Sequence, residues 1–271
     1  MIRFRILGAG GAIPTPTHTP AAYWVTVDGT AVLMDPGPGA LVRLVRCGDA
    51  PGGVDAVGLV LFTHLHPDHH GDLVALLFAL HSPLTASEAP LRLYGPAGLT
   101  DLLAALGGIY GSWLEPRKRE LVVTEWAPGA ALDLPDGGRI APFAVDHPQD
   151  RLTRGDALGY RFTDAAGHVA VFSGDTGACA GLENAARGCD LLVVECSAPD
   201  GLGVTGHLTP AEVGELCAVA GPRRVALTHQ YPAAAAADLA AAVRRRFDGP
   251  VEQARDDSLY CVPHENGETP T

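Results

Sequence analysis

The sequence predicts a mixed α/β fold, and three observations carry this prediction. Short apolar runs of strand length alternate with segments of helical periodicity along the whole chain. The 33 glycines and 22 prolines imply many tight turns, which disfavours a helical bundle. The chain of 271 residues is 47% hydrophobic, so it can bury a large core, and no linker divides it. We therefore expect one domain over residues 1–271, with a frayed tail at 264–271.

Nine apolar runs have the length and composition of β-strands. Several are apolar at every position, as strands buried on both faces are. The predicted strands are Ile2–Leu7, Tyr23–Val27, Ala31–Met34, Leu59–Phe62, Leu121–Thr124, Ile140–Val145, Val169–Phe172, Leu191–Val194 and Val225–Leu227.

Helical patterns lie between these strands. The predicted helices are Leu41–Arg46, Gly71–Leu80, Gly98–Leu106, Pro210–Val219 and Ala233–Phe247. The clearest start is at Thr209, where a Thr N-cap, Pro210 at the first helical position and Glu212 at the third form a capping box. The alanine-rich last helix ends in Arg244–Arg246, which we interpret as partners of the helix dipole rather than a nucleic-acid patch.

Charge and cysteine usage exclude several classes of protein. The net charge of −12 and the pI near 5.2 argue against a broad grip on extended nucleic acids. No apolar run reaches the length of a membrane span and no signal-peptide core is present, so we expect a soluble, cytoplasmic protein without a membrane partner. The six cysteines form no C-x-x-C pair, which indicates buried small side chains rather than a zinc ribbon or a disulfide framework.

A dense group of metal-ligand side chains directly follows the predicted strand Leu59–Phe62. The segment Thr63–Gly71 contains His64, His66, Asp68 and His69. A structural core histidine explains one such position but not a cluster. Histidine and carboxylate side chains at this density could fill two adjacent metal sites, provided that distant segments supply the remaining ligands.

Four further polar residues stand at the ends of predicted strands: His147, Asp175, Glu195 and His229. Each alone could be an ordinary turn residue. In mixed α/β folds, however, the carboxyl ends of strands gather along one edge, where ligands bind. Together these residues predict a single polar cleft built from distant segments.

These residues resemble the metallo-β-lactamase superfamily. The H-x-H-x-D-H signature stands at positions 64–69, and His147, Ser173–Asp175 and Thr228–His229 fall where the later motifs belong. The segments Leu7–Pro14, Asp35–Gly39, Tyr94–Pro96 and Gly206–Thr209 are similar, more narrowly, to the ribonuclease Z branch.

The resemblance implies a four-layer αβ/βα sandwich of two mixed β-sheets flanked by helices, with two zinc ions (or Mn²⁺ or Fe²⁺) at its edge. It assigns His64, His66 and His147 to one metal, Asp68, His69 and His229 to the other, and Asp175 as the bridge between them. It also pairs Glu195 with His207, and His207 would protonate the leaving group. Asp68 would orient the nucleophile.

Hydrolysis follows from such a site, because a hydroxide held between two divalent cations stays deprotonated near neutral pH. We expect a small phosphodiester substrate, for example a cyclic nucleotide. The alternatives are a thioester, lactone or sulfate ester on the same site, RNA processing, or a non-catalytic metal-binding regulatory module. Only 27 residues separate His147 from Asp175, which leaves no room for the long RNA-gripping arm of ribonuclease Z. By analogy with such enzymes, a homodimer is possible.

Some residues keep two interpretations. His18 either lines the substrate pocket or is an exposed loop residue, and we favour exposure. His70 is expected to be structural, and Arg117–Arg119 either borders the cleft or is a solvated charge run. The chain departs from the resembled pattern in two places: the turn Asp35–Gly39 lacks a glutamate, and Cys196–Ser197 follows Glu195.

Overall fold

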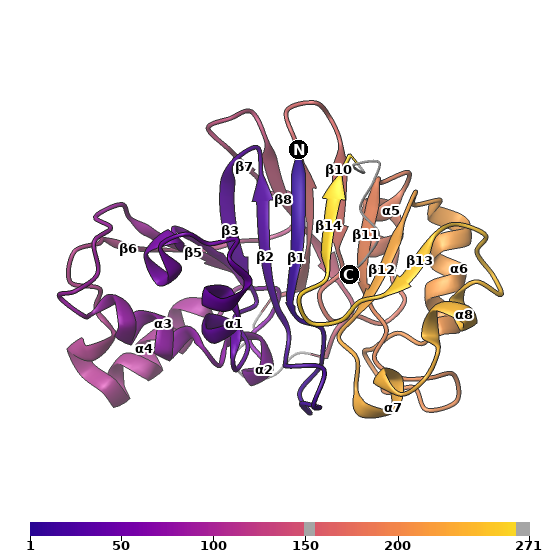
Figure 1. The fold of residues 1–271 in the computed structure, drawn as a ribbon, viewed down its shortest axis with the longest axis horizontal. Coiled ribbons are helices and arrows are strands. Elements are labelled where there is room, and N and C mark those ends of the chain that lie inside the picture. Colours follow the sequence, from indigo (N-terminus) through magenta and orange to yellow (C-terminus); the bar gives the residue numbers. More distant parts are fainter. Residues whose placement is uncertain (149–154, 264–271) are drawn as a thin grey trace.

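The computed structural model describes residues 1–148 and 155–263. Within them the strands form two mixed seven-stranded sheets (Figure 1). In spatial order the first sheet contains β14 (Leu259–Val262), β1 (Ile2–Gly8), β2 (Ala22–Val27), β3 (Thr30–Met34), β4 (Leu59–Leu61), β5 (Leu91–Gly95) and β6 (Leu121–Glu125). The second contains β13 (Val251–Gln253), β12 (Val225–Thr228), β11 (Leu191–Glu195), β10 (Val169–Phe172), β9 (Ala157–Thr163), β8 (Arg139–Val145) and β7 (Leu132–Asp133).

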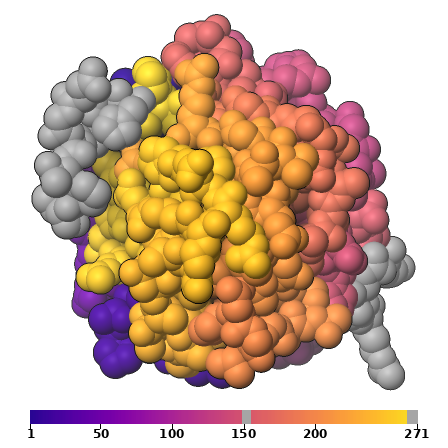
Figure 2. Space-filling view, turned by 90° about the vertical axis from the view of Figure 1, so that its right-hand side faces the viewer, coloured from indigo at the N-terminus to yellow at the C-terminus, as the bar shows by residue number. Residues whose placement is uncertain are grey.

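Helices cover the outer face of each sheet. On the first sheet lie α1 (Ala40–Cys47), α3 (Leu73–Leu80) and α4 (Leu99–Tyr110), on the left of Figure 1. On the second lie α5 (Ala180–Ala186), α6 (Pro210–Ala220) and α8 (Leu239–Val243), and Figure 2 shows this C-terminal half from the side. Two short helices, α2 (Pro67–His70) and α7 (Pro232–Ala235), lie at the lower edge of Figure 1, and the 3-10 turns are η1 (Gly53–Ala56) and η2 (Gly111–Leu114).

The core has three hydrophobic clusters, one between the sheets and one under each helical layer. Side-chain alternation along β2 shows the arrangement: Tyr23 and Val25 face the partner sheet, whereas Trp24 faces the helices. Between the sheets, Tyr23 packs against Phe172 with ring centroids 4.6 Å apart. The predicted mixed α/β sandwich of four layers is therefore confirmed, and all nine predicted strands are present.

The predicted helix Ala233–Phe247 is wrong, because the chain forms α7 and α8 with a break between them. Asp238 Oδ1 accepts a hydrogen bond from the backbone N–H of Ala241 at 2.9 Å, which starts a new helix within the alanine run. Arg244, expected to serve the helix dipole, instead donates to the carbonyl of Val251. The capping box at the start of α6 is confirmed: both hydrogen bonds between Thr209 and Glu212 are present.

Five strands escaped the sequence prediction: β5, β7, β9, β13 and β14. They are short, or they carry charged or glycine residues that hide the apolar pattern. The predicted frayed tail at 264–271 lies outside the described residues. Among the described residues, none of the six cysteines is in a disulfide; four are buried and two are partly buried. Among the described residues, none of the helices has both the length and the apolar character needed to cross a bilayer.

Candidate metal centre

The signature segment turns sharply as it leaves β4. His66 is extended, and Pro67 then occupies the first position of α2, where its missing N–H costs no hydrogen bond. The neighbouring turn after β3 approaches α2 closely at Gly37, where a Cβ atom would lie 2.0 Å from the carbonyl oxygen of Asp68. Only glycine fits there, and the close contact fixes the position of Asp68.

The structure brings all seven predicted ligand residues together. Asp175 Oδ2 lies 3.8 Å from His64 Nε2, 3.3 Å from His69 Nε2 and 3.1 Å from His229 Nε2. On one side, His66 Nδ1 and His147 Nε2 are 3.2 Å apart. On the other, Asp68 Oδ2 lies 3.4 Å from His229 Nε2 and 3.6 Å from His69 Nε2. Asp175 thus stands between two trios of potential ligands.

Asp35 contacts the ligand cluster, and our sequence reasoning did not place it there. Its fully buried carboxylate accepts hydrogen bonds from the backbone N–H of Thr63 at 2.8 Å and from the Thr63 hydroxyl at 2.7 Å. Its Oδ2 also lies 3.0 Å from His69 Nδ1. A proton on Nδ1 satisfies this contact and leaves Nε2 free to bind a metal. The sequence contained this signal, because Asp35 directly follows an apolar strand, and His147 and Asp175 likewise stand one to three residues after strands.

A hydroxyl orients His229 in a similar way. Ser197 Oγ donates to Glu195 Oε2 at 2.6 Å, so its lone pair can accept the Nδ1 proton of His229 at 3.0 Å. The backbone of His229 has φ +52°, a left-handed conformation that is uncommon outside glycine.

Glu195 and His207 form the expected pair. His207 Nδ1 lies 3.0 Å from Glu195 Oε1, and the carboxylate also accepts the backbone N–H groups of Thr176 and Leu208. Burial acts to lower the pKa of His207, but the hydrogen bond and charge of Glu195 outweigh it and raise the pKa above 6.5. The His207 ring stacks on that of His229 with centroids 5.4 Å apart, which places it beside the ligand cluster.

The electrostatics of the cluster keep His64 neutral and the carboxylates of Asp68 and Asp175 ionised. Burial and the neighbouring His69 lower the pKa of His64 well below 6.5, so His64 stays neutral, as a metal ligand must. Burial opposes ionisation of Asp175, but His229 and His69 outweigh it and lower its pKa well below 3.8. At Asp68, the hydrogen bond from His229 and the nearby His69 overcome burial and lower the pKa to about 2.

The donor set also fits divalent metal. His64 Nε2 is buried and has no hydrogen-bond partner among the described residues, although it points at the carboxylate of Asp175. A buried polar atom without a partner is costly, and a cation between the ring and the carboxylate would satisfy both. Imidazole nitrogen and carboxylate oxygen are ligands that Zn²⁺ accepts.

Comparison with known proteins agrees with this geometry. Residues 30–230 match the family described as "Beta-lactamase superfamily domain". The chain belongs to the beta-lactamase superfamily. It is 32% identical to an uncharacterized protein of Mycobacterium tuberculosis, covering 96% of this chain and 92% of that protein. It is also 32% identical to a ribonuclease Z of Mycolicibacterium paratuberculosis, covering 94% and 96%.

Solved structures show the same fold. The metallo-beta-lactamase fold protein YhfI of Bacillus subtilis superposes with a TM-score of 0.78 at 21% identity, over 96% of this chain and 98% of that one. The short form of human tRNase Z gives 0.75 at 22% identity, over 96% and 99%. A diphosphatase of the PhnP family gives 0.70 at 18% identity, over 96% of each chain. The superfamily is one of metal-dependent hydrolases, and this chain is a hydrolase of the metallo-β-lactamase fold.

Four other residues discussed in the sequence analysis are not part of the ligand cluster. The expectation that His18 is exposed is wrong, because only 4% of its surface is accessible. Arg119 is buried and donates to the carbonyl of Ala89, so it is neither a solvated charge nor part of the ligand cluster. His70 belongs to none of the ligand groups found among the described residues. Burial raises the pKa of the Cys196 thiol, which disfavours a nucleophilic thiolate.

Proposed function

We propose that this hydrolase uses two divalent metal ions, most simply zinc, to cleave a small phosphodiester such as a cyclic nucleotide. The observation that carries the proposal is the position of Asp175 Oδ2, within 3.8 Å of ring nitrogens from both trios. A carboxylate between two sets of imidazoles is the arrangement that a bridged pair of metal ions requires. His64, His66 and His147 would hold one ion, and Asp68, His69 and His229 the other.

The metal ions, when bound, supply a water of lowered pKa and positive charge opposite the attacked ester. The side chains supply position and protons. Asp35 and Ser197 present the Nε2 atoms of His69 and His229 to the site by holding their Nδ1 protons. Asp68, held by the contact at Gly37, can orient the attacking water through its carboxylate.

His207 is suited to protonate the leaving oxygen. Glu195 holds its Nδ1, so the opposite ring nitrogen can carry the proton that is donated. The raised pKa keeps a larger fraction of His207 protonated near neutral pH than an ordinary histidine would be. Glu195 itself is a positioning residue, because its oxygens are occupied by backbone N–H groups, Ser197 and His207.

Two features support a small substrate. The chain between His147 and Asp175 forms β9 and β10 in its described part, with no inserted arm there that could grip RNA. The net charge of −12 disfavours an extended polyanion. Ribonuclease and diphosphatase, the names of two compared proteins, both denote cleavage of phosphate esters or anhydrides, which supports a phosphoryl centre.

The first test is hydrolysis of bis(p-nitrophenyl) phosphate by protein loaded with Zn²⁺ or Mn²⁺. We expect metal-dependent turnover that is lost in Asp175→Ala together with bound metal. Asp133→Ala is the matched control, because its side chain is 77% exposed on β7. Metal retained in Asp175→Ala would contradict the bridging role. Protein that holds two metals yet fails to turn over would favour a thioester, lactone or sulfate ester instead.

RNA processing is the second candidate, because relatives named ribonuclease Z match nearly the whole chain. It requires binding of precursor RNA, measured as a gel shift that weakens steeply with salt. Absence of such binding by a protein that cleaves the small diester would exclude this candidate.

A further inference from the structure

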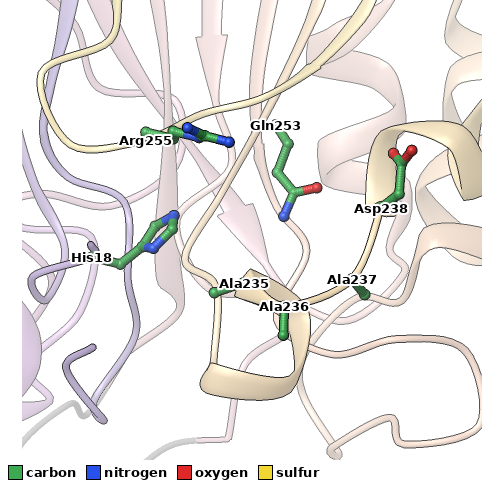
Figure 3. A pocket seen from close by; sticks show the side chains of 7 residues that line it. All are labelled: His18, Ala235, Ala236, Ala237, Asp238, Gln253 and Arg255. Atoms are coloured by element: carbon green, nitrogen blue, oxygen red, sulfur yellow. The ribbon is translucent and has the colours of Figure 1, made fainter. Parts of the chain in front are cut away.

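A cavity of about 400 Å³ opens beside the break between α7 and α8. We name it the alanine-turn pocket. Three alanines, Ala235–Ala237, form its apolar wall, and its polar lining is His18, Asp238, Gln253 and Arg255 (Figure 3). None of the seven predicted metal ligands lines it.

His18 is the unusual member of this lining. Its side chain is 96% buried, and its Nδ1 lies 2.9 Å from the Thr17 hydroxyl. Its Nε2 has no hydrogen-bond partner within residues 1–148 and 155–263. Polar atoms buried this deeply nearly always have a partner, so Nε2 is available to a group that binds in the pocket.

The charges of the pocket are separated. Figure 3 shows the His18 ring and the Arg255 guanidinium on one side and the Asp238 carboxylate on the other. Gln253 stands between them but is already satisfied, since its Nε2 donates to Gln230 Oε1 at 2.7 Å and its Oε1 accepts from the N–H of Leu239 at 3.1 Å. A ligand would therefore meet hydrogen-bond donors at one end and a carboxylate at the other.

The break in the alanine run is what creates the pocket. Alanine has the highest helix propensity, so a continuous helix from 233 to 247 is the locally favoured structure. The chain instead forms a turn at Ala236–Asp238, whose residues line the cavity. Places where a strong local preference is overridden are commonly functional sites.

We propose that the alanine-turn pocket binds a small organic anion that also carries an amino group. Its carboxylate or phosphate would contact Arg255 and a proton on His18 Nε2, and its amino group would contact Asp238. The aliphatic part would lie on the alanine wall. Gln253 contacts Gln230, which follows His229, so the pocket lies close to the metal centre without sharing its residues.

The test is a titration of the metal-loaded protein, carrying ¹³C-labelled histidine, followed through the ring signal of His18. The probes are phosphoethanolamine and 4-aminobutyrate, which differ in the anion, with ethyl phosphate and butyrate as partners that lack the amine. The His18 signal is assigned by its loss in His18→Gln. Because no hydrolysis is measured, the outcome is independent of the proposed catalytic function.

We expect the His18 ring signal to shift saturably with either phosphoethanolamine or 4-aminobutyrate. The probe that causes the shift shows whether the pocket prefers a phosphate or a carboxylate. Arg255→Gln should weaken binding about tenfold, the effect of one charge-assisted hydrogen bond. Asp238→Asn keeps the N-cap and should weaken only the amine-bearing probe. The exposed Arg223→Gln is the control and should bind normally. A His18 signal unmoved by all four probes, or moved equally in Arg255→Gln, would overturn the proposal and leave only water in the pocket.

Discussion

Replacement of Asp35 by asparagine tests how the fold prepares a metal ligand. The two residues have the same shape, but the amide offers one acceptor oxygen in place of two. The Thr63 N–H faces Oδ1 and, as a backbone donor, cannot become an acceptor, so the remaining oxygen must stay there. The amide NH₂ then faces the Thr63 hydroxyl and His69 Nδ1.

The consequence falls on His69. The hydroxyl of Thr63 can rotate to accept, but His69 Nδ1 can accept only if its proton moves to Nε2. Nε2 is the atom aimed at Asp175 and His229, so the ring must lose its favoured tautomer before it binds metal. Loss of such a supporting carboxylate typically costs 10- to 100-fold in metal affinity, about 1.4 to 2.7 kcal/mol.

Competition with a chromophoric chelator measures this affinity directly. Asp72→Asn is the control: Asp72 also accepts backbone N–H groups, from Gly39 and Leu41, but it makes no contact with the ligand cluster. Circular dichroism should show both variants folded. If Asp35→Asn bound zinc as tightly as the Asp72→Asn protein, the argument from the tautomer of His69 would be refuted.

Three further predictions concern other parts of the chain. His207→Gln should retain bound metal but hydrolyse the diester about 10² to 10⁴ times more slowly, and an unchanged rate would exclude it as the proton donor. Gly37→Ala should lower the metal content and the melting temperature, because its Cβ would lie 2.0 Å from the Asp68 carbonyl oxygen. The control is Gly107→Ala in α4, which has open space around it and should be neutral or stabilising by up to about 1 kcal/mol. Burial acts to raise the pKa of Asp164, but the N-terminal ammonium, 2.8 Å away, and two hydrogen bonds from His168 outweigh it and lower the pKa to about 2. Ionised Asp164 therefore contributes at most about 2 kcal/mol to the free energy of unfolding, and this contribution is present above pH 4 and lost as the pH falls toward 2. In urea unfolding, the free energy of unfolding of Asp164→Asn should fall less steeply over that range than that of the unchanged protein.

Much of the fold was predictable because the buried strands are apolar throughout. β10 and β11 are buried on both faces, by the other sheet on one side and by helices on the other. Every position of β10 is therefore hydrophobic, and the strand can be recognised in the sequence. β13 carries no such signal; it has the sequence Val-Glu-Gln, and it is a strand only because β12 is there to pair with it. Tertiary pairing, rather than local preference, determines such segments.

Part of the candidate site could likewise be predicted from the sequence, and part could not. His64, His66 and His69 could be recognised from spacing alone, whereas their grouping with Asp175 and His229 required the resemblance to a known superfamily. The burial of His18 could not be predicted, because it depends on a turn in which Thr15 bonds to the backbone of His18 and on packing against distant segments. The break in the alanine run was likewise hidden, since Asp238 reads equally well as a helix residue.

The pairing of β1 with β14 has a consequence for synthesis of the protein. Ile2 pairs with Val262 and Arg5 with Leu259, so β1 receives one of its neighbours from a segment that is synthesised about 250 residues later. At roughly 5 to 20 residues per second, this edge of β1 waits about 10 to 50 s for its partner. During that time its backbone groups are open to strands of other chains. The first sheet can begin to form when β1 and β2 have been made, but it is complete only after β14 has been synthesised.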